Sequence, residues 1–409
     1  MSPSSHSPHS RLRILTLNCW GLKYVSKYRT ERVAAIADFI AGSEYDLVTL
    51  QELWVFSDYE HVRSVVAKQL PHSKFFYSGA LGAGLVIFSK YPIIAATVHP
   101  YSLNGSPVDV IAGDWFVGKA AASVILSHPI LGQLQVFNTH LFAKGGDEGP
   151  DQQKAHRLVN AWEFAKYARE AAELGRYVIA AGDFNSVPTA PPMSIIRDHA
   201  TLSDAWVDTH TNVRPPAAGQ TITPIDAIHT YGVTADSPLN SYSAGKTLEP
   251  NARKFQGKRL DYVFYRGPSS ALCSAPRLKA VDTRVLLTER VPGHIYSFSD
   301  HFGLEATFDI TSDPNHTLIP PLSITFATCH LLGVLGVASC SHHRLGVVAH
   351  SWINPIFMVA SVGFTWLATT MLYIGFVYGN WEINALTNVI EELEIHRDTI
   401  EDQTKVSPL

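Results

Sequence analysis

Polar side chains able to bind a metal or move a proton follow one apolar, strand-like run of this chain. Residues 178–181 are Val-Ile-Ala-Ala, and Gly182, Asp183 and Asn185 come soon after them. We expect Gly182 to end a buried strand; in extended backbone the side chains of Asp183 and Asn185 would leave the same face. Their oxygens suit a hard divalent cation or a phosphate. Gly-Asp-x-Asn is also ordinary turn chemistry, so the rest of the chain must decide between these interpretations.

The same arrangement recurs at the ends of other strand-like runs. Each member alone has an ordinary explanation, because buried Asp and Asn commonly cap helices and a lone His is commonly a core or surface residue. Together they supply carboxylates, amides and two imidazoles but no thiolate, which favours Mg²⁺ over Zn²⁺. Such a set without a covalent nucleophile indicates attack of water on a phosphoester. The members are Asn18, Glu52, His140, Asp183, Asn185, Asp261, Asp300 and His301.

Alternating or apolar runs predict the strands that deliver these residues, and apolar positions at helical spacing predict helices between them. Strand and helix content alternate in two similar halves, so we expect an α/β fold, a four-layer α-β-β-α sandwich. The irregular segment 208–258 interrupts this pattern, and such long connections are usually functional or mobile. Strands are expected at residues 11–18, 46–52, 84–89, 93–99, 120–126, 134–139, 178–181, 259–265, 277–287 and 302–310, and helices at 31–41, 58–70 and 151–174.

Length and composition describe a large folded domain without a strong charge bias. The chain has 409 residues, a formal net charge of −4 and 46% hydrophobic residues, which excludes wholesale disorder and gives no case for nucleic acid as a partner. Residues 1–10 predict a disordered lead-in rather than a signal peptide. The cysteines lack zinc-type spacing, and we expect free buried thiols rather than disulfides. They are Cys19, Cys273, Cys329 and Cys340.

The composition changes after a proline-containing linker at residues 311–321. Residues 322–341 and 353–378 carry no formal charge, and each is long enough to cross a bilayer core of roughly 30 Å. We expect a two-helix transmembrane hairpin; the alternative is a buried helical hairpin of a soluble protein. Residues 384–403 predict an acidic amphipathic helix that is solvated or self-associating, because its charge has the wrong sign for anionic headgroups.

Short motifs across about residues 11–310 stand in the order found in a known superfamily. As an ordered set they resemble the endonuclease/exonuclease/phosphatase superfamily, whose fold resembles pancreatic deoxyribonuclease. Residues 18–21, residues 51–54, the loop 114–119 and the C-terminal hairpin look like the neutral sphingomyelinases and, more closely, the fungal inositol phosphosphingolipid phospholipases C. The ordered motifs are Leu15-Thr-Leu-Asn18, Gln51-Glu52, Thr139-His140, Gly182-Asp-Phe-Asn185, Leu260-Asp-Tyr262 and Ser299-Asp-His301.

The resemblance implies a metal site and a base. Glu52 would be the principal Mg²⁺ ligand, helped by Asn18 and Asp300. His301, oriented by Asp261, would be the general base for the attacking water. These roles agree with the requirement that a base imidazole be near neutral and held in one tautomer by a buried carboxylate.

The resemblance also implies roles around the phosphate. His140 would protonate or stabilise the leaving ceramide oxygen, while Asp183 and Asn185 would hold the water and the phosphate. Asp114 and Lys119 match a family loop that acts as a switch when anionic lipid engages the enzyme. From the residues alone, a surface ion pair is an equally good interpretation of these two.

These residues lead to one main hypothesis and three alternatives. The chain would be a membrane-anchored, Mg²⁺-dependent phospholipase C that hydrolyses inositol phosphosphingolipids, sphingomyelin or both to ceramide and a phosphorylated headgroup. The segment 208–258 is our candidate for headgroup or membrane contacts. A nuclease of the same fold lacks an evident basic groove pattern. An inositol polyphosphate phosphatase is expected to carry a Cys-Asp-Arg pattern, whereas residues 260–264 here are Leu-Asp-Tyr-Val-Phe. A catalytically dead membrane scaffold is the non-enzyme alternative, but every expected site residue is present.

The expected location is an intracellular membrane, the endoplasmic reticulum, mitochondria or both. Two spans put both termini on one side, and without a signal peptide a catalytic domain facing the cytosol is simplest. The loop 341–352 carries Arg344 while the tail is acidic, which mildly favours the opposite orientation. The expected partners are the sphingolipid substrate, the bilayer and anionic phospholipids as activators.

Overall fold

The structure is a computed structural model that forms two units, and the main unit carries the predicted site. Several predicted segments lie outside the described residues, namely the lead-in at 1–9, most of the linker, the first predicted span at 322–341 and almost all of the acidic tail. The described residues are 10–79, 82–106, 114–146, 149–217, 221–269, 275–311, 354–373, 375 and 390.

Within this described part, the strands of the main unit form two six-stranded sheets. The first sheet has the order β11-β12-β1-β2-β4-β3, and the second has the order β5-β6-β7-β8-β10-β9. The strands of the first sheet, in that order, are Arg277–Leu286, Gly303–Thr311, Ser10–Asn18, Leu47–Gln51, Val86–Ser89 and His72–Phe75. Those of the second are Ile93–Pro100, Ala120–His128, Gly132–His140, Tyr177–Asp183, Asp261–Arg266 and Ser203–Asp204.

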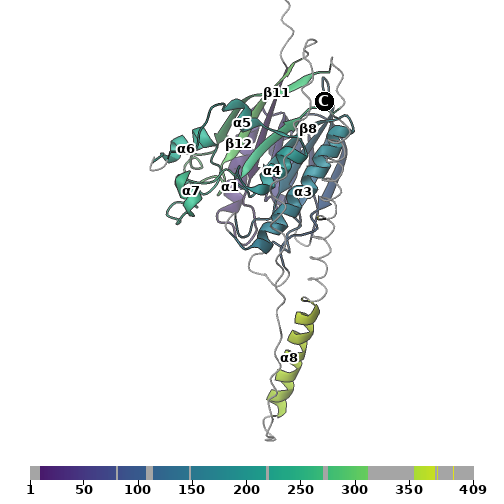
Figure 1. The fold of residues 1–409 in the computed structure, drawn as a ribbon, viewed down its shortest axis with the longest axis vertical. Helices are drawn as coiled ribbons and strands as arrows, with labels where there is room; N and C mark the ends of the chain where they lie inside the picture. Colours follow the sequence, from purple (N-terminus) through teal and green to yellow (C-terminus); the bar gives the residue numbers. More distant parts are fainter. Residues whose placement is uncertain are drawn as a thin grey trace, which may run out of the picture. The chain divides into compact units, whose positions relative to one another are not determined.

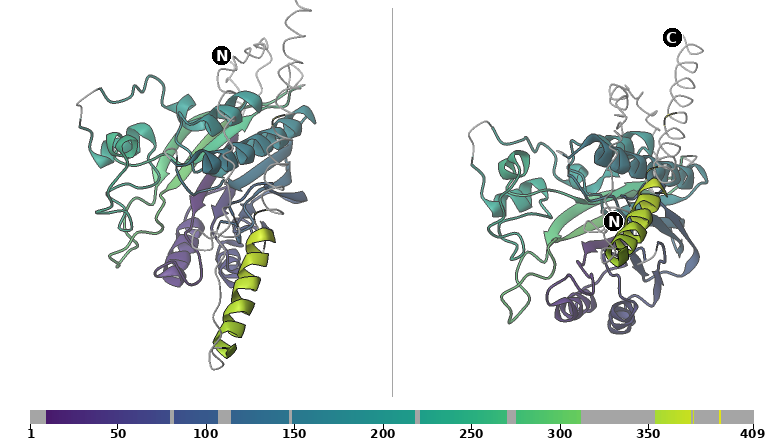
Figure 2. Two further views of the ribbon diagram at one scale, coloured as in Figure 1. Left: turned by 60° about the horizontal axis from the view of Figure 1, so that its bottom comes forward. Right: turned by 90° about the horizontal axis from the view of Figure 1, so that it is seen from below.

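Helices cover the outer face of each sheet (Figure 1). Figure 2, seen from below, shows α1 and α2 in purple on one side of the sandwich and α3 and α4 in teal on the opposite side. The helices are α1 (Arg29–Ala41), α2 (Phe56–Val66), α3 (Asp151–Glu173), α4 (Pro191–His199), α5 (Ala205–Thr209), α6 (Pro224–Tyr231) and α7 (Pro250–Lys254).

The alternation in β1 explains why there are four layers. Leu12 and Ile14 belong to a core between the two sheets, whereas Leu15 and Leu17 belong to a core shared with α1 and α2. Successive side chains of a strand point to opposite faces, so both faces of this sheet are buried. A third core joins the second sheet to α3 and α4. The predicted four-layer sandwich is confirmed.

Parallel pairs at the centre of each sheet bring polar strand ends together. β1 runs parallel to β2, and β7 runs parallel to β8. The register sets His140 opposite Asp183, and antiparallel β10 sets Asp261 opposite Asp183 on its other side. One edge of the second sheet therefore presents these three side chains in a row.

Two local expectations about the opening motif are wrong. β8 continues through Gly182 to Asp183, so the glycine does not end the strand. It is required there because a Cβ would stand 2.1 Å from the Thr139 carbonyl oxygen, and its φ is +146°. Asn185 is not extended but left-handed, with φ 47°, because its backbone N–H turns back to donate to Asp183 Oδ1 at 2.9 Å.

The segment 208–258 is less irregular than expected, since α6 and α7 lie within it. The sequence analysis also missed β3 and α4, each of which is short. Both helices α4 and α6 begin at a proline, a residue suited to the first helical turn.

The second unit contributes helix α8 (Asn354–Tyr373), which lies within the second predicted span at 353–378. Over the part of the chain that the structure describes, no helix is long and apolar enough to cross a membrane. The transmembrane hairpin stays a prediction.

Replacing Gly182 with Ala should lower the free energy of unfolding by about 2 kcal/mol or more, because the new Cβ would force β7 and β8 apart. Urea denaturation measures the change. Gly267→Ala is the matched control, since a Cβ at Gly267 meets nothing within 4 Å, and it should change stability by less than about 0.5 kcal/mol. Equal stability of the two variants would contradict this close approach.

Candidate active site

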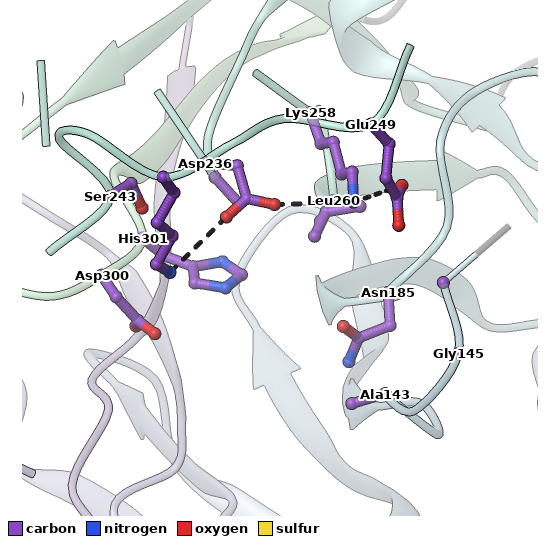
Figure 3. Close-up of a pocket in the computed structure, with 13 residues that line it drawn as sticks. Ala143, Gly145, Asn185, Asp236, Ser243, Glu249, Lys258, Leu260, Asp300 and His301 are labelled. Atoms are coloured by element: carbon purple, nitrogen blue, oxygen red, sulfur yellow. Dashed lines mark ion pairs between the residues drawn. The ribbon is translucent and has the colours of Figure 1, made fainter. Parts of the chain in front are cut away.

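The polar strand ends converge on a cavity of about 390 Å³. Asn185, Asp300 and His301 line it directly, and Figure 3 shows their side chains around the opening. The cavity lies in the size range of small-molecule sites, and its wall is polar. The site therefore has room for a phosphorylated headgroup.

Asn18 links two carboxylates at the floor of the site. Its Nδ2 donates hydrogen bonds to Glu52 Oε1 and to Asp183 Oδ2, both at 3.0 Å. Asn18 and Asp183 are each 1% exposed. The ends of β1, β2 and β8 are thus tied into one hydrogen-bonded network although they come from both sheets.

Glu52 is held in a strained backbone conformation. Its φ is 54°, a left-handed value that costs a non-glycine residue on the order of 1 kcal/mol. Its carbonyl accepts a hydrogen bond from the Gly21 N–H at 2.9 Å, and a Cβ on Gly21 would lie 2.3 Å from that oxygen. In this left-handed conformation the Glu52 carboxylate leaves the strand direction and reaches Asn18.

His301 and Asp261 form a hydrogen-bonded pair. The distance from His301 Nδ1 to Asp261 Oδ2 is 2.8 Å, and Asp261 is fully buried. His301 Nε2 lies 3.9 Å from Asp183 Oδ2. Burial alone would lower the pKa of His301, but the charges of Asp261 and Asp183 outweigh it and raise the pKa well above its usual value. This imidazole accepts a water proton only when that negative charge is offset.

Burial and two neighbouring positive charges keep His140 neutral. Its Nε2 lies 3.1 Å from Lys119 Nζ and 3.5 Å from Asp183 Oδ2. Burial, then the charges of Lys119 and His301, place the pKa of His140 well below its usual value. Among the described residues, its Nδ1 has no hydrogen-bond partner.

The Asp114–Lys119 pair lies against this histidine rather than on the surface. Lys119 Nζ is 3.2 Å from Asp114 Oδ1 and donates to the Leu141 carbonyl at 2.8 Å. Lys119 is 2% exposed and Asp114 is 8% exposed, so the surface ion pair interpretation is wrong. Trp115, which follows Asp114, is 38% exposed.

The concentration of buried carboxylates fits a bound cation. Burial first, and then the charge of Asp300, raises the pKa of Glu52 to about 7. Burial raises the pKa of Asp183 to about 6. A cation beside these groups would relieve the unfavourable negative charge that both shifts report.

The donor set points to a hard metal ion. Ligand atoms of Asp183, Asp261 and His301 all lie within 4.8 Å of one another. Cys19, the nearby thiol, is buried and free as predicted, and burial raises its pKa to about 12, so it offers no thiolate. The site can hold a metal ion through oxygen and imidazole ligands.

The structure brings together all of the site residues predicted from the sequence. Asn185 contributes through its Nδ2, which donates to the Leu141 carbonyl at 3.0 Å. Asp300 lies close enough to Glu52 for its charge to raise the pKa of that residue. Their roles in turnover stay predictions.

Several buried polar residues hold the strands and loops of the site in place. They were not predicted from the sequence. Gln51 Nε2 donates to Asn138 Oδ1 at 2.7 Å, which joins the two sheets under the site. Arg32 is fully buried and donates to the carbonyls of Cys19 and Trp20 after β1 and to that of Phe298 before His301. The sequence did offer one signal for Asn138, because it is a polar residue inside a predicted strand.

The family match covers most of this domain. Residues 15–301 match the Endonuclease/Exonuclease/phosphatase family. The chain belongs to this family. A crystal structure of SmcL has the same fold, with 17% identity, a TM-score of 0.50 and coverage of 73% of this chain and 99% of that one.

Two relatives narrow the position within the family. The chain is 36% identical to the inositol phosphosphingolipids phospholipase C of Schizosaccharomyces pombe, over 94% of this chain and 93% of the relative. It is 33% identical to human sphingomyelin phosphodiesterase 2, over 74% of this chain and 66% of the relative. Like these family members, the chain is a phosphoric diester hydrolase.

Replacing Asp261 with Asn should lower the pKa of His301 by about one unit or more, because the imidazolium loses its closest carboxylate. NMR titration of the imidazole in metal-free protein measures the pKa. Asp309→Asn, which removes a carboxylate paired with Arg11 on another part of the domain, should leave it unchanged. An unchanged pKa in Asp261→Asn would show that this pair does not control the protonation of His301.

Proposed function

We propose that the chain is a Mg²⁺-dependent phospholipase C that releases ceramide and a phosphorylated headgroup from inositol phosphosphingolipids, sphingomyelin or both. The observation that carries the proposal is the His301–Asp261 pair, in which His301 lines an open polar cavity and lies near the buried carboxylate of Asp183. Asn18 links Asp183 to the half-buried carboxylate of Glu52. The identity with the S. pombe phospholipase C supports the reaction class and the lipid substrate.

In this proposal His301 is the general base. Asp261 accepts the Nδ1 proton, which leaves the Nε2 lone pair to take a proton from the attacking water. Asp183, near that nitrogen, and Asn185 position the water and a phosphoryl oxygen. The water oxygen bonds to phosphorus as the bond from phosphorus to the ceramide oxygen breaks.

Glu52, Asn18 and Asp300 are the residues that would hold the Mg²⁺ ion. Asp261 and His301 are already paired with each other, so Glu52 offers the freer carboxylate. When bound, the ion would neutralise charge on the phosphoryl oxygens as it builds. Asn18 orients Glu52 for this task through its 3.0 Å hydrogen bond.

His140 and Lys119 serve the leaving group. The ceramide oxygen gains negative charge as its bond to phosphorus breaks, and the neutral imidazole of His140 donates a hydrogen bond to it. The buried Lys119 ammonium, 3.1 Å from His140, supplies positive charge at this place.

We propose that Asp114 and Lys119 change partners when anionic phospholipid engages the enzyme. Activation by such lipid that survives Lys119→Met would contradict this.

We also propose that residues 322–341 and 353–378 anchor the enzyme in an intracellular membrane, that of the endoplasmic reticulum or mitochondria, with the catalytic domain facing the cytosol. Helix α8 carries no charged residue and exposes Phe364, Trp366 and Leu372. The alignment with the S. pombe relative covers 94% of this chain, so it extends beyond the catalytic domain. Protection of that domain from protease added outside sealed vesicles would contradict the orientation.

Purified full-length protein with Mg²⁺ should release ceramide from vesicles containing inositol phosphosphingolipid. His301→Ala should lower kcat by about 10²–10⁴-fold, the usual contribution of a general base, with an unchanged circular dichroism spectrum. His294→Ala is the control, because that imidazole stacks on Tyr296 outside the site. Cleavage of DNA without ceramide release, or full activity of His301→Ala, would overturn the proposal.

A further inference from the structure

The cavity beside His301 continues past the reacting groups to a wall of mixed charge (Figure 3). Lys258 Nζ lies 2.9 Å from Glu249 Oε2 and 3.5 Å from Asp236 Oδ2. Lys246 Nζ lies 3.8 Å from Asp236 Oδ1. Asp236 thus stands between two ammonium groups, and both separations are long for a hydrogen bond.

The backbone ties this wall to the catalytic histidine. Ala235 exchanges backbone hydrogen bonds with Lys258, at 2.9 and 2.8 Å, and forms an isolated bridge with His301. The Thr234 carbonyl accepts from the Phe302 N–H at 2.7 Å. The two residues before Asp236 are therefore held against His301 and Phe302, so a group bound at the wall lies at a set distance from the base.

Asp236 itself has a left-handed backbone, with φ 55°. This conformation is uncommon outside glycine, although Asp tolerates it better than most residues. Non-glycine residues in such conformations cluster at functional sites, where the surrounding structure maintains them. At Asp236 the turn directs the carboxylate into the cavity, as Figure 3 shows.

The two lysines differ in how tightly they are held. The Lys258 side chain is 17% exposed and lies against both carboxylates. Burial lowers its pKa, but the hydrogen bond that it donates to Glu249 and the charge of Asp236 outweigh burial and raise the pKa. The Lys246 side chain is 53% exposed, and its one ion pair among the described residues is the 3.8 Å approach to Asp236. Lys258 therefore fixes Asp236, while Lys246 is able to move onto a ligand.

The wall suits hydroxyl groups better than a quaternary ammonium or a simple anion. A quaternary ammonium donates no hydrogen bond and prefers aromatic faces, yet no Phe, Tyr or Trp is among the described residues that line the cavity. A purely anionic group would meet the carboxylates of Asp236 and Glu249. A hydroxyl donates to a carboxylate and accepts from an ammonium, so a polyol satisfies both.

We propose that Asp236 and Lys246, braced by Lys258, form the subsite that binds the hydroxyl groups of a polyol headgroup and so determine headgroup preference. The inference rests on the proposed function, because it assumes that the phosphate lies between this subsite and His301. It assigns the inositol phosphosphingolipids, rather than sphingomyelin, as the preferred substrates.

The first test compares two lipids in the same mixed micelles. Asp236→Asn and Lys246→Met should each lower kcat/KM for inositol phosphosphingolipid by about tenfold or more, the cost of losing a charge-assisted hydrogen bond. Turnover of sphingomyelin should change by less than about twofold. Asp282→Asn is the matched control, since its exposed carboxylate pairs with Arg284 on β11. Equal losses on both lipids, no loss on either, or activity on sphingomyelin alone in the wild type would overturn the inference.

A binding measurement separates this inference from the proposed function. Calorimetric titration of the full-length protein with myo-inositol 1-phosphate and with phosphocholine needs no turnover. The wild type should bind the inositol compound more tightly, and Asp236→Asn should remove most of the difference. If the wild type hydrolyses neither lipid yet shows this preference, the proposed function fails and the subsite stands. A preference that is absent, or unaffected by Asp236→Asn, overturns the subsite even if ceramide is released.

Discussion

Buried negative charge, gathered where two parallel strand pairs end, is the constraint on which the rest of the structure depends. Parallel strands deliver their carboxyl ends to one edge, and the register sets His140, Asp183 and Asp261 side by side on the second sheet. Asn18 joins Glu52 from the first sheet to Asp183 from the second. Carboxylates removed from water cost free energy unless they are paired, protonated or bound to a cation.

The surroundings show how this charge is tolerated. The Lys119 ammonium lies beside His140, and Arg32 secures the loops that carry the neighbouring residues. Gln51 and Asn138 join the sheets beneath the site, so the two halves cannot shift independently. The charge that remains is reported by the raised pKa values of Glu52 and Asp183. A metal ion is the natural complement of such a site, and the strained backbone of Glu52 presents one carboxylate to it.

Sequence reasoning predicted the layers and the site because both follow from strand periodicity. Alternation in β1 and the apolar run in β8 identify strands whose next polar residue must stand at a sheet edge. It could not predict that Gly182 stays in the strand, since the reason is a close approach to Thr139 from another strand. The left-handed turn at Asn185 depends on a hydrogen bond to Asp183, and the burial of Lys119 depends on packing around His140.

The segment 208–258 illustrates a second limit of sequence reasoning. Its composition indicated a functional connection, but not which of its side chains face the cavity. Ala235 is placed by backbone hydrogen bonds to Lys258 and by its bridge to His301, which are far away in sequence. Long-range pairing of this kind leaves no local pattern, so Asp236 and Lys246 could be recognised only in the folded chain.

Calorimetric titration of metal-free protein with Mg²⁺ at about pH 6.5, in buffers of different ionisation enthalpy, tests the central claim most directly. Because the pKa of Glu52 is raised to about 7, a fraction of its carboxyl groups is protonated at that pH, and binding of the ion should release protons. Glu52→Gln should weaken binding by about tenfold or more and reduce the number of protons released. Glu44→Gln, at an exposed position, should bind the ion as the wild type does. Binding without proton release, or unaltered binding by Glu52→Gln, would contradict the account.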